Sequence, residues 1–209
     1  MKGFHRASGK VSSVVVTCAL SAGVIGALTG CGGGGSSSGS NGGSSEAPDI
    51  LLFSAIDPNL GEEPHISRGT ADSTRVLKNI VGSSGDSAPE NFGQLGDMIL
   101  FKAETSTDGA ELWKTDLTKE GTEQVDDLRN GQKGSNPEWI TEYNGKAYFY
   151  AEGDKGTGLW ETDGTAKGTE KISSKVSDVK YITVFDNKLY FQAKGNDGKG
   201  LELWKSDGT

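Results

Sequence analysis

Acidic and amide side chains set among glycines are the residues of this 209-residue chain best suited to bind a ligand or a cation. They recur in three loops, Glu104–Ala110, Glu152–Gly158 and Lys194–Gly200. Oxygen ligands spaced between glycines can hold Ca²⁺, but the same residues build ordinary turns, and no loop has full calcium-loop spacing. Calcium is the only cofactor considered. The candidate binding residues are Asp108, Asp154, Asn196 and Asp197, and the three aspartates are also the candidate calcium ligands.

Residues suited to catalysis are few. His65 is the only histidine after the first thirty residues, so acid–base catalysis through histidine has a single candidate. Carboxylates are plentiful, and a pair of them could hydrolyse a glycosidic bond. No phosphate-binding loop, metal-binding histidine cluster or nucleophile elbow occurs. The sequence therefore assigns no catalytic residue, and a hydrolase or lyase acting on glycan is kept as the alternative to a non-enzymatic binding protein.

An octapeptide occurs three times in clear form and once in degraded form. It reads ELWKTDLT at Glu111–Thr118, GLWETDGT at Gly158–Thr165 and ELWKSDGT at Glu202–Thr209. The degraded copy, Glu63–Thr70, places His65 at the tryptophan position. A Gly-Thr or Ser-Thr pair follows each of the first three copies. Self-similarity at a spacing of roughly 45 residues predicts a repeat architecture.

The tryptophans fall into two groups. Trp113, Trp160 and Trp204 occupy the repeated position, and large aromatic side chains at such positions are expected in the core between repeats. Trp139 has no tryptophan counterpart in the other units and follows the loop that ends at Pro137. We therefore keep Trp139 as a candidate ligand contact.

Each repeat is expected to form four short antiparallel strands. In the third unit they are predicted at Trp139–Tyr143, Lys146–Ala151, Leu159–Thr162 and Thr169–Ser173. The pair Asn144-Gly145 favours a two-residue hairpin turn, which requires positive φ. No sustained helical period occurs after residue 46, so almost no helix is expected. The predicted fold is all-β, with fourteen strands in four sheets, of which the first lacks its first strand and the last lacks its fourth.

The octapeptides resemble those of the bacterial ELWxxDGT-repeat proteins and, more loosely, the TolB-type propellers. The resemblance covers residues 48–209 and departs from the pattern in the first copy and at Leu117, where the turn glycine is replaced. It implies a β-propeller-like array of four-stranded repeats with about 3.5 blades. Two sheets would be incomplete, which leaves two readings of residues 48–209. They could form a minimal ring with incomplete terminal blades, or, as we expect, a C-terminally truncated piece of a longer array.

Loop lengths indicate where a binding site would lie on such an array. The turns between the first and second strands are tight, whereas the loops at the opposite face are longer, among them Val81–Pro89 and Arg129–Pro137. Loops on a rigid scaffold often carry binding residues. We expect any protein or glycan partner at this loop face, and Asn130 joins the candidate binding residues.

The N-terminus has the pattern of an export signal. Basic residues precede the apolar run Val11–Ala27, which is too short to span a membrane. The sequence Leu28-Thr29-Gly30-Cys31 resembles a bacterial lipobox, which implies lipid attachment, including palmitate, at Cys31 after removal of residues 1–30. A plain secretory signal is the alternative. Residues 31–47 then form a lipidated, Gly/Ser-rich flexible tether. By the same resemblance, Gly32 after the cysteine implies the outer membrane, on its periplasmic or external face.

The charge of the chain limits its partners. The formal net charge is -8 at pH 7, and loss of the basic signal makes the remainder more acidic. This charge argues against binding of nucleic acid or of an anionic lipid surface by electrostatic attraction. The predicted function is a lipid-anchored envelope protein with a non-enzymatic interaction module. Its membrane contact is the N-terminal lipid, and the sequence leaves the oligomeric state open.

Overall fold

The computed structural model describes residues 13–17, 50–173 and 175–208. This part of the chain is all-β, with one short 3₁₀ helix at Ala71–Ser73. Among these residues no helix has the length and apolarity needed to cross a membrane. The expectation of an almost helix-free, strand-rich fold is therefore confirmed.

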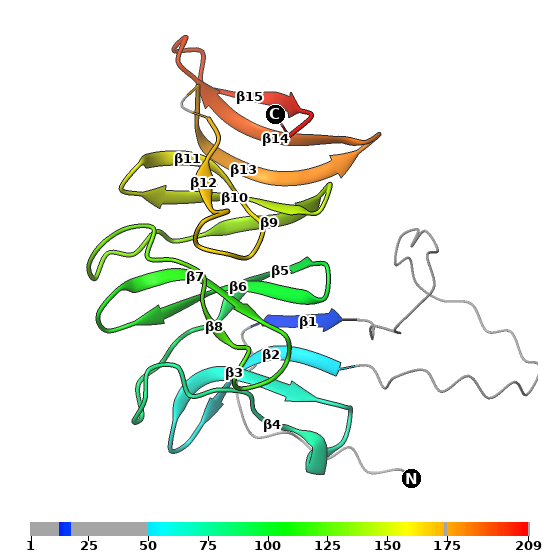
Figure 1. Cartoon of the computed structure of the whole chain (residues 1–209), viewed down its shortest axis with the longest axis vertical. Helices are drawn as coiled ribbons and strands as arrows, with labels where there is room; N and C mark the ends of the chain where they lie inside the picture. The colour runs from blue at the N-terminus through cyan, green and yellow to red at the C-terminus, as the bar shows by residue number, and fades with distance from the viewer. Residues whose placement is uncertain (1–12, 18–49, 174, 209) are drawn as a thin grey trace, which may run out of the picture.

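Four antiparallel sheets, formed in chain order, lie one over another along the long axis of the molecule (Figure 1). The first contains β1 (Ser13–Thr17), β2 (Ile50–Asp57), β3 (Gly61–Ser67) and β4 (Arg75–Val76). The second contains β5 (Glu90–Leu95), β6 (Met98–Thr105), β7 (Gly109–Thr115) and β8 (Glu123–Gln124). The third contains β9 (Glu138–Tyr143), β10 (Lys146–Gly153), β11 (Gly156–Thr162) and β12 (Glu170–Lys171). The fourth contains β13 (Val176–Phe185), β14 (Lys188–Gly195) and β15 (Leu201–Ser206). Strands β2 to β15 follow the predicted order, and no sheet closes into a barrel.

Strand β1 was not expected. Its residues belong to the apolar run assigned to the signal peptide, yet they pair antiparallel with β2 and take the first place in the first sheet. The physical reason is the β-branched run of three valines, which favours extended structure. Cleavage before Cys31 would release β1 and open the edge of β2. The rest of the predicted signal peptide, Cys31 and the tether lie outside the described residues, and their assignment remains a prediction.

The tight turns predicted between the first and second strands are present in the second, third and fourth sheets. Each joins two strands through two residues that adopt positive φ at one or both positions, as two-residue hairpins require. The turn pairs are Gly96-Asp97, Asn144-Gly145 and Asp186-Asn187.

The last strand of each complete repeat is shorter than predicted. β12 contains two residues instead of the five expected from Thr169 to Ser173. After it, the amide of Ile172 donates to the carbonyl of Leu159 at 3.0 Å, and the Ile172 side chain packs between the third and fourth sheets. The side chain that follows β12 thus contributes to the next interface between sheets.

The core lies between successive sheets. Between the second and third sheets it is formed by residues such as Leu112, Val125, Phe149 and Trp160. Trp113 and Trp160 are buried, which confirms the prediction that the repeated tryptophans belong to the core. Trp204 occupies the same place in the fourth sheet but is only half-buried.

Candidate interaction surface

In the second and third units the end of the octapeptide forms a hydrogen-bonded turn, described first for the third unit. Asp163 Oδ1 accepts from both the amide and the hydroxyl of Thr165, at 2.9 and 2.7 Å. The Thr165 hydroxyl oxygen in turn accepts from the amide of Gly168 at 3.0 Å. These bonds hold the pKa of Asp163 below its ordinary value. The aspartate therefore serves the turn, as predicted from the sequence.

The second unit repeats this turn with Asp116, Thr118 and Gly121. A Cβ atom on Gly121 would collide with the carboxylate of Asp116, just as one on Gly168 would collide with that of Asp163. The glycine of the recurring Gly-Thr pair is required for this reason. Leu117 takes φ 69° where the other copies have glycine, so the turn keeps its form at the cost of a strained leucine.

A hydrogen bond between two threonine hydroxyls joins the end of the third strand to the start of the last strand. Thr162 Oγ1 and Thr169 Oγ1 lie 2.7 Å apart, and the equivalent pair Thr115 and Thr122 has the same distance. The residue three places after the second threonine then donates its amide to the third strand, as Ile172 does. Val125 does so to Leu112 at 2.8 Å. The segment Gly-Thr-x-x-apolar is thus the unit that closes a sheet.

The fourth sheet has no such closing strand among the described residues. β15 pairs only with β14. Trp204 is nonetheless oriented as in the third unit: its Nε1 donates to the Ala193 carbonyl at 3.1 Å, and Trp160 Nε1 donates to Ala151 at 3.2 Å. The two tryptophans therefore differ in what covers them and not in how their own sheets hold them.

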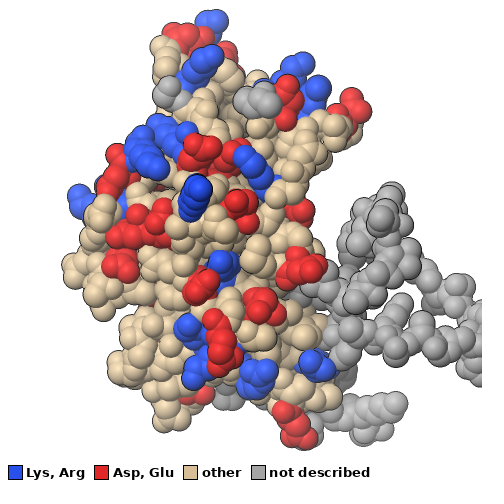
Figure 2. Space-filling view, in the orientation of Figure 1, with Lys and Arg blue, Asp and Glu red and all other residues tan. Residues whose placement is uncertain are grey.

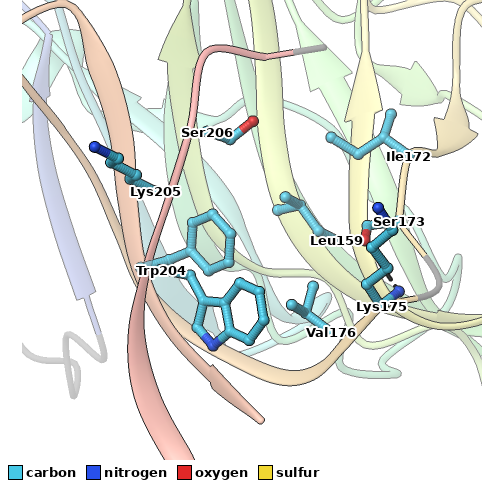
Figure 3. Close-up of a pocket in the computed structure, with 9 residues that line it drawn as sticks. Leu159, Ile172, Ser173, Lys175, Val176, Trp204, Lys205 and Ser206 are labelled. Carbon is cyan, nitrogen blue, oxygen red and sulfur yellow. Dashed lines mark hydrogen bonds between the residues drawn. The ribbon is translucent and has the colours of Figure 1, made fainter. Parts of the chain in front are cut away.

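A pocket of about 220 Å³ opens between the third and fourth sheets, beside β15 (Figure 3). Its apolar floor joins the third and fourth sheets, and serines and lysines form its rim. The floor consists of Leu159, Ile172, Val176, Phe191 and Trp204, and the rim of Ser173, Lys175, Lys205 and Ser206.

Large hydrophobic side chains are exposed mainly on this same sheet. Leu203 is 77% exposed, whereas its counterpart in the third unit, Leu159, is 2% exposed. Phe185 is 71% exposed. Of the six exposed large hydrophobics among the described residues, five lie on the fourth sheet, and Ile56 on the first sheet is the other; the five are Tyr181, Val184, Phe185, Leu201 and Leu203. Charged residues of both signs are interspersed elsewhere on the face shown in Figure 2.

The structure places two of the predicted loop residues together. Asp154 accepts from the backbone amide of Asn130 at 3.3 Å and also from its side-chain amide. These bonds keep the pKa of Asp154 below its ordinary value. Both candidate binding residues are thus engaged in joining the Arg129–Pro137 loop to the β10–β11 turn.

The other loop candidates lie in two different loops. The amide of Asp108 donates to Thr105 Oγ1 at 3.1 Å within the second sheet. Asp197 pairs with Lys199 at 3.4 Å in the β14–β15 loop, which also contains Asn196. Burial, together with the charges of Asp108, Asp154 and Asp126, raises the pKa of Asp127. Within the described ranges no three His, Cys, Asp or Glu side chains are grouped to hold a metal ion.

Trp139 lies between the third and fourth sheets. Its ring packs 4.5 Å from that of Tyr181, measured between ring centroids. It sits at a bulge with φ 60°, a conformation that is strained for an aromatic residue. Its Nε1 is buried without a hydrogen-bond partner among the described residues. The geometry thus assigns its indole mainly to packing between sheets.

Sequence reasoning missed two buried carboxylates at the first position of the octapeptide. Glu111 accepts from the amides of Leu128 and Arg129 at 3.1 and 3.2 Å, and from Ser135 Oγ at 2.5 Å. Burial raises the pKa of Glu111 to about 7.

Glu63 repeats this arrangement in the first unit. It accepts from the amides of Ile80 and Val81 and from Ser87 Oγ, and burial raises its pKa. The shared spacing from glutamate to serine was the signal available in the sequence. Each carboxylate ties the loop after its own sheet to that sheet, whereas Glu202 in the fourth unit is exposed.

Comparisons with known proteins give no family assignment. No family model matches the chain, and no curated protein matches it. The resemblance to ELWxxDGT-repeat proteins therefore rests on the octapeptides alone, and the functional argument rests on the geometry of the fourth sheet.

Proposed function

We propose that this chain is a non-enzymatic, protein-binding module of the bacterial cell envelope, held at the outer membrane by a lipid on Cys31 and the tether of residues 31–47. Its stacked sheets act as a rigid scaffold, and the fourth sheet binds the partner. The observation that carries this proposal is the concentration of exposed hydrophobic side chains on β13 to β15. Contiguous exposed apolar surface rimmed by polar residues is typical of interaction sites.

A protein partner fits this surface better than a small molecule. The pocket beside Trp204 has a volume of about 220 Å³, below the roughly 300–1,000 Å³ of small-molecule sites. Phe185 and Leu203, the two most exposed large hydrophobics of the fourth sheet, are not among the residues that line this pocket. Exposed apolar side chains of this size are typical of surfaces that contact another protein.

The alternative, a glycan hydrolase or lyase, has one favourable observation. Asp127 lies among Asp108, Asp126 and Asp154, and its raised pKa is a property of catalytic acids. Glu63 and Glu111, the other carboxylates with raised pKa values, each accept three hydrogen bonds within the scaffold. Retention of any glycan cleavage by wild type and its loss in Asp127→Asn would favour this alternative.

Photo-crosslinking in cells tests the proposed function. A photoreactive residue is placed at Phe185 or at Leu203, with Ile56 as the matched exposed position on the first sheet. We expect one shared adduct from the two fourth-sheet positions and none from position 56. Equal labelling from all three positions would contradict the proposal. Metabolic labelling with palmitate tests the anchor, and Cys31→Ser should abolish it.

A further inference from the structure

We infer that a small acidic sugar, one that carries a phosphate or carboxylate group, binds in a cavity at the outer edge of the third sheet. The cavity has a volume of about 360 Å³ and is lined by Lys155, Glu170, Lys171, Ile172 and Ser173. Its size falls within the roughly 300–1,000 Å³ of small-molecule sites. The inference goes beyond the proposed function, because it concerns a second ligand and a different sheet.

Two lysines supply the positive charge of this cavity. Lys155 lies in the turn between β10 and β11, and Lys171 lies in β12, directly opposite Trp160. The Lys171 side chain runs over bare backbone, since a Cβ atom on Gly156 would lie 2.7 Å from its Nζ and one on Gly158 would lie 3.3 Å from its Cε. Its ammonium group is thus placed beside the residue that follows Lys155 in the turn.

Neither ammonium group has a counter-ion within the described part of the chain. The ion pairs between described residues include neither Lys155 nor Lys171. Asp154, the acid next to Lys155, accepts instead from the backbone and side-chain amides of Asn130. Neighbouring ammonium groups repel each other, and a bound anion would relieve this repulsion through charge-assisted hydrogen bonds.

The positive charge is specific to the third unit. The residue opposite the third position of the octapeptide is Val76 in the first unit and Gln124 in the second, and both are neutral. The β2–β3 turn, residues 58–60, and the β6–β7 turn, residues 106–108, contain no lysine or arginine. The fold therefore does not require basic residues at these places, and the two lysines are available for binding.

The third unit also lacks the buried carboxyl group of the other units at this place. Gly158 stands at the first position of the octapeptide, where Glu63 and Glu111 are buried in the first and second units. A Cβ atom on Gly158 would lie 3.0 Å from the carbonyl oxygen of Val176. A carboxylate at this position would repel a bound anion, so its replacement by glycine leaves the charge of Lys171 free to act on a ligand.

The remaining residues of the cavity suit the hydroxyl groups of a sugar. The carboxylate of Glu170 can accept hydrogen bonds from hydroxyls. Ser173 Oγ accepts from the amide of Lys175 at 3.1 Å and keeps its own proton to donate. Ile172 adds one apolar contact. Two ammonium groups beside separate hydroxyl-binding groups favour an acidic sugar over an inorganic anion.

The second unit shows that this edge of a repeat stays accessible when the next sheet is complete. The second sheet is followed by the complete third sheet, and its residues equivalent to Glu170 and Ser173 are Glu123 and Asp126. Glu123 is exposed and Asp126 is half-buried. The inferred site therefore depends on the third unit and not on the arrangement of the fourth sheet.

Binding of four defined probes by the full chain tests the inference. The probes are glucose 1-phosphate, glucuronic acid, uncharged glucose and inorganic phosphate, and isothermal titration calorimetry measures each affinity. We expect both acidic sugars to bind, glucose to bind at least about tenfold more weakly, and inorganic phosphate to bind more weakly than glucose 1-phosphate. The order of the two acidic sugars then distinguishes a phosphorylated from a carboxylated ligand, and either order supports the inference.

Lysine variants locate the site. Lys155→Gln and Lys171→Gln should each weaken binding of the acidic sugars about tenfold, because each removes a charge-assisted hydrogen bond. Lys171→Arg should keep most of the affinity, and Lys167→Gln, at an exposed turn of the same unit, should leave it unchanged. Three results would overturn the inference: no binding of either acidic sugar, equal affinity for inorganic phosphate and glucose 1-phosphate, which would show an adventitious ion only, or unchanged affinity in both glutamine variants.

Discussion

The third and fourth sheets are built from the same repeat but end differently. Both begin with a tight hairpin, and both hold the octapeptide tryptophan through a hydrogen bond from Nε1 to the second strand. In the third sheet β12 then covers the outer edge, and Trp160 is 1% exposed. In the fourth sheet β15 has β14 as its one strand partner among the described residues, and Trp204 is half-buried. The orientation of this tryptophan is therefore set by its own hairpin, while its burial differs between the two sheets.

Truncation of the two tryptophans should give the largest contrast. Trp160→Ala is expected to lower the free energy of unfolding by about 3–5 kcal/mol, because it leaves a cavity between two sheets. Trp204→Ala should cost roughly 1–2 kcal/mol, since less area is removed from water in the native state. Chemical denaturation followed by circular dichroism measures both. Equal costs would show that Trp204 is covered as fully as Trp160.

The glutamates of the octapeptide provide the second contrast. Glu111→Ala is expected to cost about 2–4 kcal/mol, because two buried amides and the Ser135 hydroxyl lose their acceptor. Glu202→Ala should have little effect, because the Glu202 side chain is exposed. Denaturation at pH 5 compares the two variants, and a large cost at position 202 would contradict the contrast.

The raised pKa of Glu111 also predicts the sign of a pH effect. Its native-state pKa of about 7 lies above the ordinary value of 4.5. The folded protein therefore holds the proton more tightly than the unfolded chain does. This contribution to stability is complete below pH 4.5 and is lost as the pH rises through 7. The stability of wild type relative to Glu111→Gln should fall over this window, and a rise would refute the assignment.

The hydroxyl pair at the turn gives a smaller contrast. Thr162→Ala is expected to cost about 1 kcal/mol, since the hydroxyl binds both Thr169 and the Gly164 amide. Ser206→Ala should cost roughly half as much, because it removes the bond to the Gly208 amide alone. Thermal unfolding compares the pairs, with Thr162→Ser as the control that keeps the hydroxyl. A larger loss from Ser206→Ala would argue for a partner already bound there.

The lysine that precedes the turn should give the smallest contrast. Lys114→Met removes an ion pair with Glu123 and a 2.9 Å hydrogen bond to the Gly164 carbonyl of the next sheet, and should cost about 0.5–1 kcal/mol. Lys205→Met should change the free energy of unfolding by less than about 0.3 kcal/mol. Urea denaturation of both variants measures the two losses in free energy of unfolding. A loss from Lys205→Met as large as that from Lys114→Met would contradict the prediction.

The fold was largely predictable because its signals are local. Turn pairs such as Asn144-Gly145 require positive φ, and the octapeptide fixes a strand followed by a hydrogen-bonded turn. The role of Asp163 in its turn was also predictable, because the turn is formed by residues close in sequence. Repetition then supplied the order of β2 to β15.

The remaining features depend on contacts distant in sequence. The buried role of Glu111 requires Leu128 and Ser135, which lie in the following loop. Trp139 was a candidate ligand contact because it is unique, yet Tyr181 from the next sheet packs against it. The candidate surface itself was missed because nothing in the string ELWKSDGT distinguishes a covered copy from an open one.

Backbone amide hydrogen exchange tests the central claim most directly, by comparing β11 with β15 in the full chain. The account predicts slow exchange at the β11 amides that face β12, and fast exchange at the corresponding amides of β15, whose outer edge is open in the described structure. Equal protection of the two strands would contradict the claim that the fourth sheet presents an open edge.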